Sequence, residues 1–230
     1  MHHGTTSSEG WADLDSLLIG LYVTIDDLLG RPARLPGRKP KLTDSELACL
    51  AVAQVMLACP SEHRWLRFAM VRLGHLFPYL PQQPGYNKRL RALFPLLNRV
   101  LRHLAYQTPS WCDPLRLLDA TPLPCARSRE TVERSALRGY ANYGYCASHS
   151  RYFWGFKLYL LTTPDGLVVD WCLADPKLKG QLSLQEHGGR TPAGVMARIA
   201  QRLLALGAGV WWNWQIGAAH EKRSLVAYDH

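Results

Sequence analysis

Apolar positions recur at helical spacing through the first half of the chain. Residues 13–29 place leucine and isoleucine side chains on one face with acids near both ends, which predicts an amphipathic helix. Thr43 and Glu46 have the spacing of a capping box, in which each side chain satisfies a backbone N–H of the first helical turn. We therefore expect a second helix that begins near Asp44 and ends before Pro60.

Two further helical segments follow, and both are basic. Ser61 can cap a helix over 61–77, and residues 86–107 alternate basic and apolar positions with a kink or a restart expected at Pro95. Short basic helices can form a DNA reader of the helix-turn-helix type. Aliphatic packing with the arginines turned to water explains the same pattern, and the spacing does not separate the two interpretations.

The pattern changes to strands at Leu115. The run Leu115–Leu118 predicts a buried strand, and it is followed directly by Asp119. Pro122 and Pro124 argue against continued pairing in a central strand, because proline lacks the N–H of a sheet ladder. We therefore expect Asp119 near the end of a strand.

The remaining elements are predicted by turn and cap chemistry. Residues 126–151 are polar, basic and rich in glycine, which favours a loop with one short helix. Apolar runs at 152–161 and 167–174 flank the turn sequence Thr-Pro-Asp-Gly and predict a hairpin. Thr191 followed by Pro192 predicts the start of a last helix.

Composition and charge narrow the class of protein. The chain has 230 residues, 47% of them apolar, which is enough to build a core. Its net charge of +9 favours a polyanionic partner such as nucleic acid. Six cysteines without a CxxC pair indicate reduced thiols in a cytoplasmic protein.

Membrane targeting is not predicted. The first residues lack a basic region followed by an apolar one, so we expect no signal peptide. The uncharged run Leu203–Ala219 is short for a membrane span and contains Gly, Asn and Gln. We interpret it as a core helix, and we expect no membrane partner.

Basic side chains gather in a proline-rich segment and in one of the helices. Residues 31–41 hold three prolines and five basic residues, which is typical either of a solvated loop or of an arm that contacts phosphates. The candidate DNA-binding residues are Arg38, Lys39, Lys41, Lys88 and Arg89.

Several segments, taken in order along the chain, resemble the DDE transposases of bacterial insertion sequences. The first-acid region carries most of the likeness, in LLDATPLPC followed by GYANYGYCASHSRYFWGFKLYLLTTPDGLV. The family's N-terminal helical region is similar to LTDSELACLAVAQVM and PGYNKRLRALFPLLNRVLRHL, and its C-terminal end is similar to GRTPAGVMARIAQRLLALGAGVWWNWQIG and KRSLVAYDH. The resemblance covers most of the chain.

The resemblance implies a ribonuclease-H-like catalytic core that cleaves and transfers DNA strands. In that family two aspartates and a glutamate bind two divalent ions, usually Mg²⁺ with Mn²⁺ as a substitute, that activate water and then a DNA 3′-hydroxyl. Asp119 matches the first aspartate, which implies a catalytic and metal-binding role. Lys157 matches a lysine of the same motif, and a strand cation on the solvent face is the alternative.

The partner acids that such a centre needs are not found in their expected contexts. Two cations about 3.5–4 Å apart require several converging carboxylates. Of the eight acids after Asp119, three are candidates by position: Asp170 in the second hairpin strand, Asp175 before a proline, and Glu186 in a polar segment. None of them has the family's sequence context, and no strand is predicted between the hairpin and the last helix.

We therefore predict a transposase remnant with an internal deletion between about Leu178 and Arg190. Its expected organisation is α+β: a helical, basic N-terminal domain over 1–110, a truncated ribonuclease-H-like core of about three antiparallel strands over 111–180, and a C-terminal helix and tail over 181–230. Binding of Mg²⁺ or Mn²⁺ by this chain is not expected.

Three functional hypotheses follow. The first is an inactive transposase by descent. The second is a non-catalytic DNA-binding fragment that competes with a full-length transposase for the element ends. A homo-oligomer is compatible with this hypothesis. The third is a product without selected function, whose sheet has an uncovered edge and aggregates.

Overall fold

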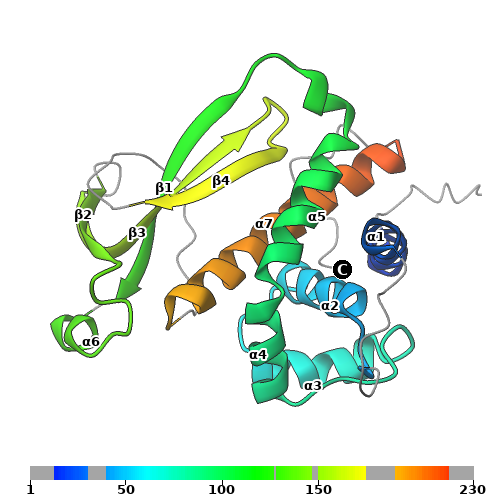
Figure 1. The fold of residues 1–230 in the computed structure, drawn as a ribbon, viewed down its shortest axis with the longest axis horizontal. Coiled ribbons are helices and arrows are strands. Elements are labelled where there is room, and N and C mark those ends of the chain that lie inside the picture. The colour runs from blue at the N-terminus through cyan, green and yellow to red at the C-terminus, as the bar shows by residue number, and fades with distance from the viewer. Residues whose placement is uncertain (1–12, 31–39, 127, 147–149, 175–189, 218–230) are drawn as a thin grey trace, which may run out of the picture.

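The computed structural model describes residues 13–30, 40–126, 128–146, 150–174 and 190–217. These ranges form helices and a small antiparallel sheet, so the α+β class expected from the sequence is confirmed. In Figure 1 the sheet lies to one side of most of the helices, of which those over Phe94–Tyr106 and Pro192–Gln215 run nearest to it, while the short helix over Arg129–Glu133 lies on the side of the sheet. The helices are α1 (Leu14–Leu29), α2 (Asp44–Met56), α3 (Glu62–Arg72), α4 (Gln83–Ala92), α5 (Phe94–Tyr106), α6 (Arg129–Glu133) and α7 (Pro192–Gln215), with a short 3₁₀ turn at Pro109–Cys112.

The helix starts predicted from cap residues are confirmed. The Thr43 hydroxyl accepts a hydrogen bond from the N–H of Glu46, and the Glu46 carboxylate accepts one from the N–H of Thr43, so the capping box of α2 is complete. The Thr191 hydroxyl caps α7 by accepting a hydrogen bond from the N–H of Gly194. Pro95 lies in the first turn of α5, so the predicted interruption is a restart of the helix, which suits a residue without an N–H.

The sheet is organised around its longest strand, β3. On one side β3 (Arg151–Thr162) pairs with β1 (Leu117–Ala126). On its other side the first half of β3 pairs with β2 (Asn142–Cys146) and the second half with β4 (Val168–Ala174). All of these pairings are antiparallel, and β3–β4 is the predicted hairpin.

The prediction that the prolines end the first strand is wrong. β1 continues through Pro122 and Pro124, so Asp119 is the third residue of a ten-residue strand and lies near its start. The prediction of a buried strand over Leu115–Leu118 is also wrong, because β1 begins at Leu117 and these leucines are exposed. The carbonyl oxygen of Leu123 and the nitrogen of Cys125 face β3, where a Cβ added to Gly155 would lie 1.8 Å and 3.0 Å from them. The backbone groups of the two prolines alternate with these and point away from β3. A proline costs no ladder hydrogen bond there.

Strand β2 was not predicted. Its sequence, Asn-Tyr-Gly-Tyr-Cys, lies in the segment expected to be a loop with one short helix, and α6 is that helix. The described part of the sheet therefore has four strands where about three were expected.

The helices and one face of the sheet share one large hydrophobic core. Helix α7 packs against α1, α2, α4 and α5, and these helices together with α3 are called the helical body below. The sheet contributes side chains from alternate positions of its strands, including Leu123, Phe156, Leu158 and Leu160. The prediction that the run beginning at Leu203 lies in a core helix is confirmed, since α7 is buried along most of its length.

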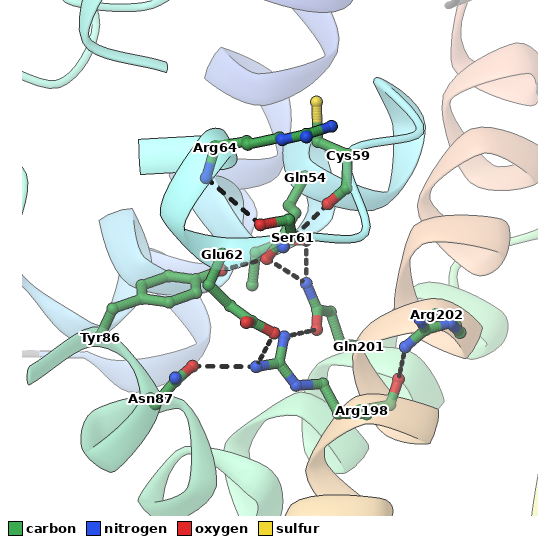
Figure 2. Close-up of polar contacts among 11 residues, drawn as sticks. Gln54, Cys59, Ser61, Glu62, Arg64, Tyr86, Asn87, Arg198, Gln201 and Arg202 are labelled. Atoms are coloured by element: carbon green, nitrogen blue, oxygen red, sulfur yellow. Dashed lines mark hydrogen bonds and ion pairs between the residues drawn. The ribbon is translucent and has the colours of Figure 1, made fainter. Parts of the chain in front are cut away.

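A cluster of polar side chains lies inside the helical body and joins α7 to the helices around it (Figure 2). The guanidinium of Arg198 forms an ion pair with Glu62 of α3 and donates to the amide oxygen of Asn87 in α4 at 2.9 Å. The side chains of Arg198 and Glu62 are only 12% and 21% exposed. This pair therefore fixes α3 and α4 against α7.

The second half of this cluster is fully buried. The side-chain amide of Gln201 donates to the carbonyl oxygen of Ala51 at 2.8 Å and to the side-chain oxygen of Gln54 at 3.1 Å. Gln54 also accepts a hydrogen bond from the hydroxyl of Tyr86 at 2.8 Å. Burial raises the pKa of Tyr86, so this hydroxyl stays protonated and able to donate. The cluster is a structural link, because each of these groups is engaged by another.

None of the helices in the described ranges combines the length and the apolarity that crossing a membrane requires.

Candidate functional site

Asp119 lies on the face of the sheet that packs against the helices. Its Cα pairs with Leu160 of β3, and its carboxylate accepts a hydrogen bond from the N–H of Ala120 at 2.7 Å. The side chain is half-buried. Thr121 lies two residues further on the same face and is fully buried, and its hydroxyl has no hydrogen-bond partner among the described residues.

Asp170 does not approach Asp119. Leu160 pairs with Asp119 on one side and with Trp171 on the other, so Asp170, one position before Trp171, belongs to the opposite face of the sheet. Its carboxylate accepts a hydrogen bond from Arg102 of α5 at 2.9 Å. Partial burial raises the pKa of Asp170, but the hydrogen bonds from Arg102 and from the N–H of Trp171 outweigh it and hold the pKa below 3.8.

The other two candidate acids, Asp175 and Glu186, lie outside the described residues. Within the residues that are described, no three His, Cys, Asp or Glu side chains are grouped so that they could hold a metal ion. The donor set of a two-ion centre is therefore not formed by Asp119 and its described neighbours.

Lys157 is buried, so the interpretation of this residue as a cation on the solvent face is wrong. It lies in β3 opposite Pro122, with its side chain on the face away from Asp119, and it is only 2% exposed. Burial of an ammonium group costs free energy unless the group has an interaction partner, and Lys157 is not without one.

The second candidate site is a basic surface on the helical body. The fifty residues from His63 to Cys112 contain eight arginines and lysines and no aspartate or glutamate. The acid that precedes this stretch, Glu62, is neutralised by Arg198. The surface of α3, α4 and α5 is therefore positive.

Several cations of this stretch are used for structure. Arg89 donates to the carbonyl oxygen of Leu42 at 2.8 Å and to the carboxylate of Asp44 at 2.7 Å. Arg72 pairs with Asp15, and Arg99 donates to the carbonyl oxygen of Leu28. Arg89 was expected to bind DNA, but its guanidinium ties α4 to the start of α2.

Four cations remain exposed and without an ion pair or side-chain hydrogen bond in the described part of the chain. Arg64 and Arg67 lie on α3, and Lys88 and Arg91 lie on α4. We call these four residues the basic patch. Helical spacing places Phe68 and Val71, which are both exposed, beside the arginines of α3.

The sequence-predicted DNA-binding residues have different positions relative to this patch. Lys88 belongs to it, and Lys41 is exposed with its ammonium 5.1 Å from the centre of the Tyr79 ring. Arg38 and Lys39 lie outside the described residues. Sequence reasoning missed Arg64, Arg67 and Arg91 as site residues, although the absence of acids between Glu62 and Asp113 was a visible signal.

A scan against protein-family models and searches of curated proteins and of solved structures returned no match.

Proposed function

We propose that this chain is a DNA-binding protein that descends from a DDE transposase of a bacterial insertion sequence and does not cleave DNA. The observation that carries the proposal is the basic patch, four cations on two adjacent helices that have no ion pair with any described residue and lie in a stretch without acids. Clustered arginines and lysines bind the phosphates of a duplex and release its counterions. The proposal places the protein in the cytoplasm, with the ends of the element as its partner.

The order of the elements supports the descent. A ribonuclease-H-like core begins with a strand that bears the first acid, followed by an antiparallel hairpin. Here Asp119 lies on β1, β1 pairs with β3, and β3 pairs with β4 through a tight turn. Three of the family-like segments that flank this region form α2, α4, α5 and α7, which pack together in the helical body.

The donor set among the described residues supports the proposed absence of cleavage. Hydrolysis and strand transfer at phosphodiesters by two divalent ions need carboxylates that bridge and hold both ions. Asp119 supplies one carboxylate, Asp170 lies on the other face of the sheet, and the described residues do not fit the Mg²⁺ or Mn²⁺ pair that the resemblance implies.

The nuclease part of the proposal is tested with supercoiled plasmid carrying the element ends. We expect no nicking by the purified protein in Mg²⁺ or in Mn²⁺. Nicking by the wild-type protein that disappears in Asp119→Ala would contradict the proposal, because it would require further acids to complete the centre.

The DNA-binding part is tested by fluorescence anisotropy with a labelled duplex over a range of salt concentrations. The double variant Arg64→Ala and Arg67→Ala removes two cations of the basic patch, and we expect a lower affinity with a salt slope reduced by about 2. The matched control is Arg129→Ala with Arg134→Ala, which removes two exposed cations from α6 and leaves binding nearly unchanged. An affinity that does not vary with salt, or an equal loss in both double variants, would contradict a phosphate-binding patch.

A further inference from the structure

Three tyrosines line one face of the ribbon that β2 forms with the first half of β3. Tyr145 pairs with Tyr152 across the two strands, and Tyr143 pairs with Trp154. Directly paired residues of antiparallel strands share a face, and so do residues two apart on one strand. Tyr143, Tyr145 and Tyr152, called the tyrosine ladder below, therefore form one continuous aromatic surface that ends on the buried Trp154.

The ladder is open to solvent in the described structure. Tyr152 is 80% exposed, and Tyr143 and Tyr145 are about half exposed. The rings of Tyr145 and Tyr152 have centroids 4.9 Å apart, so each holds the other in place. Tyr86 shows the contrast, since it is fully buried and its hydroxyl donates to Gln54.

The charge around the ladder is positive. Residues 134–164 contain no aspartate or glutamate. Arg151 directly precedes Tyr152, and Arg138 forms an isolated bridge with Ala141 just before β2. Both arginines are exposed, and neither has an ion pair among the described residues.

We infer that the tyrosine ladder binds single-stranded DNA by stacking unpaired bases on its rings, with the neighbouring arginines on the phosphates. Exposed aromatic rings beside cations are the surface that sequence-tolerant single-strand binding uses. A closed duplex does not fit this surface, because its bases already stack on one another. A second copy of the chain fits less well, because it would bring the arginines of two molecules of charge +9 together.

This inference rests on the proposed function only in taking DNA as the partner. The ladder is formed by the sheet and the basic patch by α3 and α4, so the two surfaces can be disabled separately. The basic patch is expected to hold duplex, and the ladder is expected to hold the unpaired strand beside it.

The experiment measures anisotropy of a labelled oligothymidylate of about 20 nucleotides, and in parallel of a blunt duplex. The full-length double variant Tyr145→Ala with Tyr152→Ala should bind the oligothymidylate at least about tenfold more weakly than the wild type. Its affinity for the duplex should be unchanged. Because both rings are exposed, a thermal unfolding curve should show that the variant still folds.

Two controls make the result specific. Tyr145→Phe with Tyr152→Phe keeps both rings and should bind the oligothymidylate like the wild type, whereas a loss equal to that of the alanine variant would overturn stacking as the cause. Tyr106→Ala removes another exposed tyrosine from α5 and should leave single-strand binding unchanged.

The remaining outcomes separate this inference from the proposed function. Wild-type binding of the oligothymidylate by the alanine variant would overturn the inference and leave the basic patch untouched. Loss of duplex binding in that same variant would also overturn it, because the ladder would then serve both forms of DNA. A concentration-dependent dimer in light scattering that disappears in Tyr152→Ala would assign the ladder to a second copy of the chain.

Discussion

The helical body and the sheet differ in where they keep their polar and aromatic side chains. In the helical body Glu62 and Arg198 lie inside and neutralise each other, and Gln54, Tyr86 and Gln201 are buried in hydrogen bonds. In the sheet, the tyrosine ladder points to water. Polar groups that are buried and paired hold elements in one arrangement, whereas aromatic groups that remain exposed are available to a partner.

The difference teaches that the buried polar contacts that hold elements together and the exposed aromatic ladder lie in different parts of this molecule. Removing one member of a buried ion pair leaves the other charge buried without a partner or water to solvate it. The free energy of unfolding should therefore be sensitive to single substitutions in the helical body. Removing an exposed side chain of the tyrosine ladder should lower the free energy of unfolding only slightly.

The largest effect is expected for Glu62→Ala. This change leaves the guanidinium of Arg198 partly buried beside Asn87 and Gln201 without a counter-charge. We expect the free energy of unfolding to fall by about 3–5 kcal/mol, measured by denaturant titration with tryptophan fluorescence. The control is Glu130→Ala, which breaks an exposed pair with Arg134 on α6 and should cost less than about 1 kcal/mol. An equal fall in the free energy of unfolding in the two variants would contradict the greater sensitivity of the helical body.

The second effect tests the inside of the sheet. Gly155→Ala would place a Cβ 1.8 Å from the carbonyl oxygen of Leu123, so β1 and β3 must separate locally. We expect a loss of about 3 kcal/mol in the same titration, at the upper end for overpacked sites. Gly85→Ala is the matched control, because its Cβ would meet only Pro81 at 3.8 Å in a helix, where alanine is favoured by up to about 1 kcal/mol. A tolerated Gly155→Ala would refute the close pairing of the two strands.

The third effect concerns the contact between the sheet and the helical body. The indole N–H of Trp171 in β4 donates to Asn98 of α5 at 2.9 Å, and the Trp171 ring meets Phe94 edge to face. Asn98→Ala leaves this half-buried N–H without its partner and should cost about 1–2 kcal/mol. Gln107→Ala, which removes an exposed amide bonded to His103, should be nearly neutral. If both changes were neutral, the Trp171 contact would not hold the sheet to the helices.

The smallest effect is pH-dependent. Since the pKa of Asp170 is lower in the folded protein than its ordinary value of 3.8, the carboxylate stabilises the fold above that pH. This contribution is lost as the pH falls through the folded pKa, when the acid becomes protonated. Asp170→Asn should therefore cost less than about 1 kcal/mol at neutral pH, because the pair with Arg102 is about half exposed. The difference from wild type should shrink as the pH falls below 3.8, and a difference that grows there would contradict the pairing.

Local chemistry explains what could be predicted of the fold. The caps at Thr43, Ser61 and Thr191 satisfy N–H groups within three residues of themselves, so their helices start where the sequence indicates. The β3–β4 hairpin follows from a turn sequence and two apolar runs beside it. The extension of β1 through Pro122 and Pro124 could not be predicted in the same way, because it depends on which edge of the strand faces β3.

For the candidate site too, local sequence predicted some features and contacts between distant residues decided the others. The sequence indicated Asp119 and Lys88 as candidates by residue type and neighbours, and it also showed the stretch without acids between Glu62 and Asp113. The faces of Asp119 and Asp170 were decided by the register of three strands, and the hydrogen bonds of Arg89 to Leu42 and Asp44 were decided by the packing of α4 against α2.

The sequence by itself determined the capped starts of α2, α3 and α7, the hairpin, the excess of positive charge and the single carboxylate on the first strand, because each depends on neighbours along the chain. The tertiary structure alone decided that Lys157 is buried, that α7 joins the N-terminal helices through Arg198, and that three tyrosines form one exposed face. These features depend on contacts between residues far apart in the chain, and the hydrophobic pattern of either partner alone does not specify them.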